Sequence, residues 1–130
     1  MKTGIKGQAE ITVTADLLAS HIGSGAVSVY ATPMMIAGIE NTAAASVAPE
    51  LAEGDVTVGV DVNVAHVSAT PLGMKVRFQT ELTEISTSGK VLTFAVEAYD
   101  EAGLIGKGTH RRAIVNRAKF ESRTNSKQPA

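Results

Sequence analysis

Apolar and polar positions alternate through most of the second half of the chain. Valine occupies every second position from Val56 to Val64, which is the pattern of a strand with one buried face. Segments 87–90 and 100–103 are rich in turn-forming residues and predict hairpins between neighbouring strands. The four strands that the pattern predicts cover residues 56–66, 74–85, 91–99 and 104–115.

One helix is predicted ahead of these strands, after a short first strand at 9–14. Thr32 is a favoured N-cap, and Pro33 is tolerated in the first turn, where its missing N–H costs nothing. The helix should end before Pro49, because the residue that precedes a proline is pushed out of the α region. One strand, one long helix and four strands indicate an α+β fold in which an antiparallel sheet covers the helix.

The 130 residues fit one domain, which we place at residues 1–116. Segment 117–130 carries four basic residues and one acidic residue, whereas residues 1–116 carry eight basic and twelve acidic ones. We expect this basic segment to be a flexible, solvated tail. Contact with a phosphorylated ligand is the functional alternative.

Composition excludes several classes of function. The formal charge of −1 and the aromatic share of 4% argue against a nucleic-acid partner, which requires positive charge and stacking surfaces. The absence of cysteine removes disulfides, thiolate metal sites and a cysteine nucleophile. No run of about 18 apolar residues is present to cross a membrane, and we expect a cytoplasmic protein. The histidines are too widely spaced for a metal motif, so neither a metal nor a cofactor is expected.

Glu40 and His66 are the first candidates for chemistry. Helical spacing puts Glu40 on the same face as an apolar set: Ile36, Ala37, Ala43, Ala44 and Val47. Most helical glutamates are exposed, but these neighbours predict that Glu40 points toward the core. His66 continues the parity of the valines in its strand and could equally be a structural core histidine. Packing of helix on sheet would bring the two side chains together as a carboxylate and a general base.

Thr32 is the third candidate. Its ordinary role is to cap the helix, and a helix N-terminus also offers N–H groups to a developing oxyanion. Thr32 precedes Glu40 by eight residues, or about 12 Å along an ideal helix. A ligand lying between them, or an adjusted first turn, would be needed to join the two.

Several segments together resemble the fluoroacetyl-CoA thioesterase family of hot-dog proteins. The similarity runs in order over residues 29–120, which is more specific than any single short motif. The segments that carry it are Tyr30-Ala31-Thr32-Pro33-Met34-Met35 through Glu40, Ala48-Pro49-Glu50-Leu51 with Gly54, 64–73 around His66, and Gly108-Thr109-His110-Arg111-Arg112-Ala113.

The resemblance implies a hot-dog fold, in which a curved antiparallel sheet of about five strands wraps one long helix. It also implies a homodimer, or a tetramer, with acyl-CoA sites at the subunit interface, where groups from two chains can surround one ligand. Thr32, Glu40 and His66 match the catalytic residues of the family. Gly59 and Arg112 match its substrate-contacting residues.

The sequence departs from the family before the helix. The fluoroacetyl-specific member carries an aromatic lid residue there, whereas the stretch 23–28 is shorter and has no aromatic residue. The resemblance therefore implies an acyl-CoA thioesterase that acts on a small acyl group, and the departure leaves open whether fluoroacetyl-CoA is a substrate. In the implied reaction Thr32 stabilises the oxyanion, Glu40 attacks or activates water, and His66 transfers the proton.

Two alternatives have to be weighed against a thioesterase. Hot-dog hydratases carry an Asp-x-Asn-Pro-x-His type motif, and neither Asn41 nor Asn63 precedes a proline, so that class is disfavoured. The other alternative is a non-catalytic acyl-CoA binder in which Glu40 and His66 merely satisfy each other. Turnover, as opposed to ligand-induced stabilisation without product, would separate the two.

Overall fold

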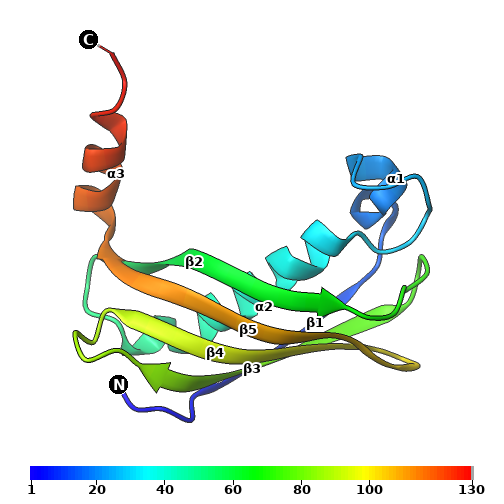
Figure 1. Cartoon of the computed structure of the whole chain (residues 1–130), viewed down its shortest axis with the longest axis horizontal. Helices are drawn as coiled ribbons and strands as arrows, with labels where there is room; N and C mark the ends of the chain where they lie inside the picture. Colours follow the sequence, from blue (N-terminus) through cyan, green and yellow to red (C-terminus); the bar gives the residue numbers. More distant parts are fainter. Residues whose placement is uncertain (130) are drawn as a thin grey trace.

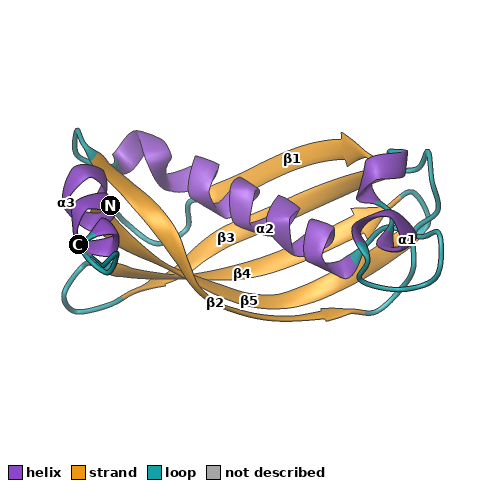
Figure 2. Cartoon of the chain, turned by 90° about the horizontal axis from the view of Figure 1, so that it is seen from above, coloured by secondary structure: helices purple, strands orange, loops and turns teal. Residues whose placement is uncertain are grey.

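The computed structural model describes residues 1–129. Five antiparallel strands form one sheet in the order β1-β3-β4-β5-β2, and the long helix α2 lies across one face of it (Figures 1 and 2). The predicted α+β class is confirmed. The strands are β1 (Lys6–Thr12), β2 (Asp55–His66), β3 (Lys75–Ile85), β4 (Val91–Asp100) and β5 (Gly103–Asn116). The helices are α1 (Ala19–Ile22), α2 (Thr32–Val47) and α3 (Arg117–Asn125), with 3-10 turns η1 (Ala15–Leu17) and η2 (Ala48–Glu50).

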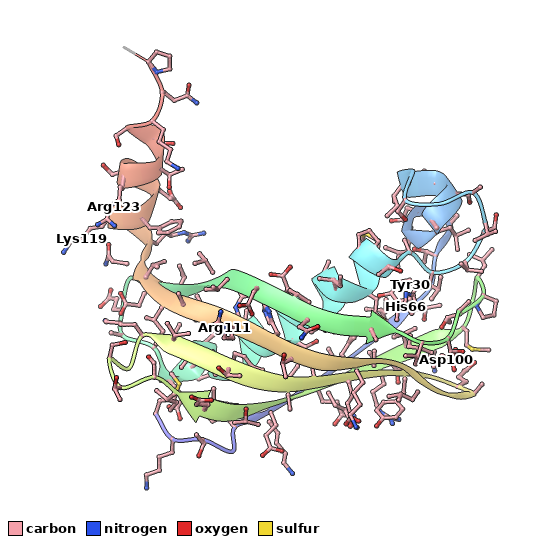
Figure 3. All side chains as sticks on the ribbon, in the orientation of Figure 1. Tyr30, His66, Asp100, Arg111, Lys119 and Arg123 are labelled. Atoms are coloured by element: carbon pink, nitrogen blue, oxygen red, sulfur yellow. The ribbon has the colours of Figure 1, made fainter. Side chains whose placement is uncertain are left out.

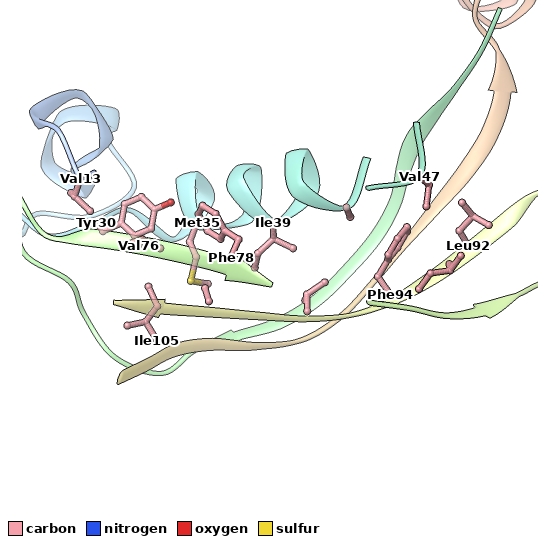
Figure 4. Close-up of a cluster of buried hydrophobic side chains, with 14 of the residues drawn as sticks. Val13, Tyr30, Met35, Ile39, Val47, Val76, Phe78, Leu92, Phe94 and Ile105 are labelled. Carbon is pink, nitrogen blue, oxygen red and sulfur yellow. The ribbon is translucent and has the colours of Figure 1, made fainter. Parts of the chain in front are cut away.

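The core lies between α2 and the sheet (Figure 4). The helix contributes one stripe of fully buried side chains, spaced four residues apart along the face that meets the sheet: Met35, Ile39, Ala43 and Val47. Phe78 and Phe94 are the largest buried side chains of the facing strands. Gly38 lets the helix approach the sheet, because a Cβ at that position would lie 2.2 Å from Cζ of Phe78.

This stripe is rotated away from the one predicted for Glu40. Ile36 and Ala44 are only half-buried and Ala37 is exposed. The side chain of Glu40 is 38% exposed. Glu40 therefore lies at the border of the apolar stripe, beside β2, because the helix turns its Met35–Ile39–Ala43 line to the core.

Strand β2 contains a bulge that the alternating valines do not reveal. Its register against β5 shifts between Gly59 and Asp61, which leaves Val60 as the extra residue. Since paired residues of antiparallel strands share a face, Val62 lies on the helix side with His110, whereas Val58 lies on the opposite side with Ala113. The prediction that all five valines share a face was wrong, because a bulge reverses the parity of a strand.

Helix α2 begins at Thr32, so Thr32 is its first residue and not its N-cap. Ala31 is the N-cap and no side chain caps the helix. The Thr32 side chain is therefore free for another partner. At the other end the helix stops at Val47, and Pro49 lies in the 3-10 turn η2, as the proline predicted.

The basic segment after β5 begins with a helix. Asn116 caps α3 by accepting a hydrogen bond from the Lys119 N–H at 3.0 Å, and the Arg117 N–H donates to Gly54 O at 2.9 Å. All side chains of α3 are exposed, and the helix itself was not predicted. Of the described helices, none is long and apolar enough to cross a membrane.

Candidate active site

Thr32 and His66 form one half of the candidate site. The first residue of α2 and the last residue of β2 come together there, with 2.7 Å between Thr32 Oγ1 and His66 Nδ1. The other ring nitrogen of His66, Nε2, is buried and has no hydrogen-bond partner within residues 1–129. This nitrogen is the ring atom left for a proton of a substrate or of water.

Burial sets the protonation of His66. Loss of hydration lowers the pKa of the imidazole below its ordinary value of 6.5, and a backbone hydrogen bond with Ser68 opposes this shift. The ring is therefore neutral at neutral pH, because desolvation disfavours the charged form. A neutral imidazole can accept a proton.

The start of α2 leaves one backbone donor beside this pair. The N–H groups of Met34 and Met35 both donate to Ala31 O at 3.0 Å, and Pro33 has no N–H. Among the described residues, no acceptor is found for the N–H of Thr32. The site therefore offers the hydroxyl and the amide of Thr32 to an oxyanion, at the positive end of the helix dipole.

A cavity of about 340 Å³ opens beside Thr32 and His66. It is walled by the segment between α1 and α2, including Gly25 and Val27, and by the residues that follow β2, Val67–Ala69. Figure 3 shows Tyr30 and His66 together at this end of the molecule. The remaining lining side chains are small or apolar, which suits a small uncharged group.

Glu40 and Arg112 form the other half of the candidate site. Arg112 Nη1 lies 3.3 Å from Glu40 Oε2, and the guanidinium is held further by Thr57, whose Oγ1 accepts from Nε at 2.8 Å and whose backbone O accepts from Nη2 at 3.0 Å. Burial lowers the pKa of Arg112 from its ordinary value, and the negative charge of Glu40 opposes this shift. An arginine stays charged throughout the accessible pH range, so the pair fixes the direction of the Glu40 carboxylate.

His110 supports Arg112 from within the core. It is fully buried, and its Nε2 lies 3.1 Å from Arg112 Nη1. Because an arginine nitrogen only donates, Nε2 must accept, and the proton of the neutral ring must be on Nδ1. Nδ1 lies 2.7 Å from Asp61 O, which can only accept, so both contacts agree on one tautomer.

Gly59 allows the carboxylate of Glu40 to reach this position. A Cβ on residue 59 would lie 2.4 Å from Glu40 Oε2. The bulge at Val60 puts Gly59 and Thr57 on the face of β2 that meets Arg112 and Glu40. The missing side chain of Gly59 thus makes room for the Glu40 carboxylate, and the bulge orients β2 so that Thr57 and Gly59 face it.

The five residues singled out in the sequence therefore fall into two groups. Thr32 lies with His66, and Glu40 lies with Gly59 and Arg112. No hydrogen bond or ion pair joins Glu40 to His66 within residues 1–129, and the expectation that they meet in one chain is wrong. Thr32 contacts His66 and Glu40 contacts Gly59. Glu40 is therefore separated from His66 by the two helical turns between Thr32 and Glu40, which run along the seven residues of β2 between Gly59 and His66.

Sequence reasoning gave no role to His110 and Thr57. His110 follows Gly106 and Gly108 in β5, where a polar residue on the core-facing parity of a strand indicates a buried hydrogen-bond partner. Thr57 alternates with the valines of β2, so one buried valine face would leave Thr57 on the opposite, solvent side, whereas the bulge puts it on the side of Arg112. Among residues 1–129, no three or more histidine, aspartate and glutamate side chains converge on a point that could hold a metal ion.

Comparison with known proteins finds relatives of this chain in both sequence and structure. The fluoroacetyl-CoA-specific thioesterase family, FlK, matches residues 13–118. The fluoroacetyl-CoA thioesterase of Streptantibioticus cattleyicolor is 36% identical over 102 residues, which are 78% of this chain and 72% of that protein. A crystal structure of a FlK threonine-to-serine variant with acetyl-CoA superposes with a TM-score of 0.92 at 27% identity, over 99% of this chain and 100% of that chain.

The fold is also found beyond that family. A hot-dog-like protein from Thermanaerovibrio acidaminovorans superposes with a TM-score of 0.89 at 21% identity, over 100% of this chain and 95% of that one. Fold and site together thus define a hot-dog thioester hydrolase, as predicted. The chain belongs to the fluoroacetyl-CoA-specific thioesterase family. The alternative of a non-catalytic acyl-CoA binder receives no support from this membership.

Proposed function

We propose that this protein hydrolyses the thioester of small acyl-CoA molecules, and that each active site is shared by two copies of the chain. The observation that carries the proposal is the division of the site into two complementary halves. Thr32 and His66 offer an oxyanion site and a neutral base. Glu40, held by Arg112, offers an oriented carboxylate. Neither half alone contains all the groups that hydrolysis of a thioester requires.

Strand β2 supports the pairing of two chains. It lies at the edge of the sheet and, within residues 1–129, pairs with β5 alone, so a row of backbone N–H and C=O groups along its 12 residues is available to pair with another strand. Two identical edge strands pair antiparallel about a two-fold axis. An axis through Asn63 keeps paired residues on one face of the sheet and would place His66 of one chain opposite the bulge of the other, at Gly59 and Val60. Each Thr32–His66 pair would then face the Glu40–Arg112 pair of the second chain.

The size of the cavity supports a small acyl group. About 340 Å³ beside Thr32 and His66 is at the lower end of the range for ligand pockets, roughly 300–1,000 Å³, and part of it must hold the thiol end of the coenzyme. The structural relative FlK has been crystallised with acetyl-CoA. We propose acetyl, propionyl and similar acyl groups as substrates. A cytoplasmic location stays a prediction.

In the proposed reaction the carbonyl oxygen of the thioester lies at the Thr32 hydroxyl and N–H. In one route a water molecule attacks the carbonyl carbon and loses a proton to Glu40, the C–S bond breaks, and the proton reaches the thiolate through His66. In the other route Glu40 attacks the carbonyl carbon and forms a mixed anhydride as the C–S bond breaks. A water molecule then hydrolyses this anhydride to the free acid and Glu40, and His66 takes the proton of that water and passes it to the thiolate. Arg112 holds the carboxylate in place. These steps use only side chains that the two halves already present.

Thiol release from a series of acyl-CoAs tests the proposed activity. Glu40→Gln and His66→Ala should each reduce kcat at least about 100-fold, since a positioned acid or base contributes roughly 10²–10⁴-fold. Glu50→Gln, which alters an exposed carboxylate in η2, is the matched control and should keep full activity. Full activity in Glu40→Gln and His66→Ala would reject the proposed function.

A further inference from the structure

The end of β5 and the first turns of α3 enclose a small groove that the proposed reaction does not use. It has a volume of about 190 Å³ and is lined by Val115, Asn116, Lys119, Phe120 and Arg123. Phe120 is a large aromatic side chain, yet it is 39% exposed, because α3 has no buried residue. The groove thus combines an apolar floor, an aromatic face and two positive charges.

The two positive charges of the groove are not neutralised within the chain. Arg117 pairs with Glu121 at 3.3 Å across one turn of α3. Within residues 1–129, neither Lys119 nor Arg123 has a carboxylate within 4.0 Å. Both side chains are labelled in Figure 3, where they lie on the same side of α3. The groove therefore attracts an anion, although the protein as a whole has a formal charge of −1.

Within one chain this groove and the Thr32–His66 cavity lie at opposite ends of β2 (Figure 3). Pairing of two chains would change this relationship. If His66 lies opposite the bulge of a second chain, then the start of β2 in the second chain, at Asp55, lies alongside the segment that follows His66. Asp55 pairs with Asn116, the residue that caps α3. The basic helix of the second chain would therefore begin beside Val67–Ala69, which wall the Thr32–His66 cavity.

We propose that this groove binds the phosphorylated nucleotide end of the coenzyme A whose thioester lies in the cavity of the other chain. Lys119 and Arg123 contact its phosphate groups, and Phe120 stacks against the adenine ring. Such a groove would explain why the segment after residue 116 carries a net positive charge, whereas residues 1–116 carry a net negative one. This inference rests on the proposed function, because it assumes an acyl-CoA in a site shared by two chains.

Substrate truncation tests this assignment. We would compare acetyl-CoA with acetyl-pantetheine, which has the same thioester and no nucleotide, in the wild type and in the double variant Lys119→Ala/Arg123→Ala. The variant should raise the KM for acetyl-CoA about tenfold, which corresponds to about 1.4 kcal/mol, because both side chains are exposed and salt screens their contacts with phosphate. It should leave kcat for both substrates and the KM for acetyl-pantetheine unchanged. Phe120→Ala should raise the KM for acetyl-CoA alone in the same way.

The control is Lys90→Ala/Lys127→Ala, which removes the same charge from exposed positions outside the groove. It should leave both KM values unchanged. An unchanged KM for acetyl-CoA in Lys119→Ala/Arg123→Ala, or equal changes for both substrates, would overturn the subsite while leaving the proposed hydrolysis intact. Absence of any acyl-CoA hydrolysis by the wild type would instead overturn the proposed function.

A competition experiment on the wild type avoids any question about folding of the variants. Adenosine 3′,5′-bisphosphate, which reproduces the nucleotide end with two of its phosphates, should inhibit hydrolysis of acetyl-CoA competitively and leave hydrolysis of acetyl-pantetheine unaffected. Adenosine without phosphates should inhibit much less. If the bisphosphate fails to inhibit, or inhibits both reactions equally, the groove does not bind the nucleotide.

Discussion

The carboxylate of Glu40 is held by Arg112 and not by His66. Oε2 of Glu40 lies 3.3 Å from Nη1 of Arg112, whereas His66 is hydrogen-bonded to Thr32 at the far end of β2. Arg112 is in turn fixed by His110 and Thr57. A carboxylate with this support keeps one direction, which is what positioned catalysis requires.

Replacement of Arg112 by lysine should cost both activity and stability. A lysine keeps the charge but cannot reach Thr57 and Glu40 together, because it lacks the fork of the guanidinium. We expect Arg112→Lys to lower the free energy of unfolding by about 1–3 kcal/mol, as for buried polar groups left unpaired, and to reduce kcat. Urea unfolding and thiol release measure the two effects.

Arg111→Lys is the matched control for that change. Arg111 is the neighbouring arginine, but it lies on the exposed face of β5 and pairs there with Asp61. An exposed pair contributes only about 0–1 kcal/mol. Equal losses of stability in the two variants would contradict the role assigned to Arg112.

Gly59→Ala should impair catalysis more than folding. The new Cβ would lie 2.4 Å from Oε2 of Glu40, and Glu40, at 38% exposure, can swing into solvent to relieve the contact. We expect kcat to fall at least about tenfold with a stability change below roughly 1 kcal/mol. In the background of Glu40→Gln, the same change should have no further effect on kcat, since both act through one carboxylate. Additive losses in the double variant would show that Gly59 acts elsewhere.

His66 should set an acid limb in the pH profile of kcat/KM. Burial lowers its pKa below 6.5, so the ring stays neutral as the pH falls to 6.5 and the base is lost only below that value. The apparent pKa of this limb should therefore be lower than 6.5, and the limb should persist in His21→Ala, in which another histidine is removed. A limb centred above 6.5 would contradict the desolvated environment of His66.

The same shift links His66 to stability. The unfolded chain takes up a proton near pH 6.5, whereas the folded chain does so only at lower pH. Stability is therefore highest above pH 6.5 and decreases as the pH falls from 6.5 to the pKa of the folded state. The difference in unfolding free energy between wild type and His66→Gln, measured by urea unfolding across this window, should show that slope. A difference that is independent of pH would contradict the shift.

Gly38→Ala tests the packing of α2 on the sheet. Alanine is favoured over glycine in a helix by about 1 kcal/mol, so without a clash the variant would be more stable. The new Cβ would instead lie 2.2 Å from Cζ of the buried Phe78, and overpacking of a core costs about 1–3 kcal/mol. We expect net destabilisation in thermal unfolding. Ala45→Gly, at an exposed position of the same helix, should show the helix propensity alone.

The sequence predicted the elements better than the faces they present. Pro33 and Pro49 bracket α2 and fix its length, and the turn-rich segments define the hairpins. The bulge at Val60 could not be predicted, because it changes the register against β5 without interrupting the alternation of valines. As a consequence the alternation puts Thr57 on the wrong face. The hydrogen bond that holds Thr32 could not be foreseen either, since a threonine at this position also suits an N-cap.

The candidate site was likewise predicted only in part. Periodicity shows which face of an element a residue occupies, but not which positions of two elements lie opposite each other. Glu40 and His66 do face the same side of the sheet, yet the crossing of α2 over β2 matches Thr32 with His66 and Glu40 with Gly59. His110 was passed over because a single histidine in a strand carries no motif, although its burial makes it the support of Arg112.

The division of the site between two chains can be measured directly by mixing inactive variants. Glu40→Gln supplies an intact Thr32–His66 half, and His66→Ala supplies an intact Glu40–Arg112 half. After denaturation together and refolding, random pairing should give half mixed dimers, each with one complete site, and hence roughly a quarter of wild-type activity. Each variant refolded alone should stay inactive. A mixture that is as inactive as its components, in dimers shown to have exchanged, would contradict an active site built from two copies of the chain.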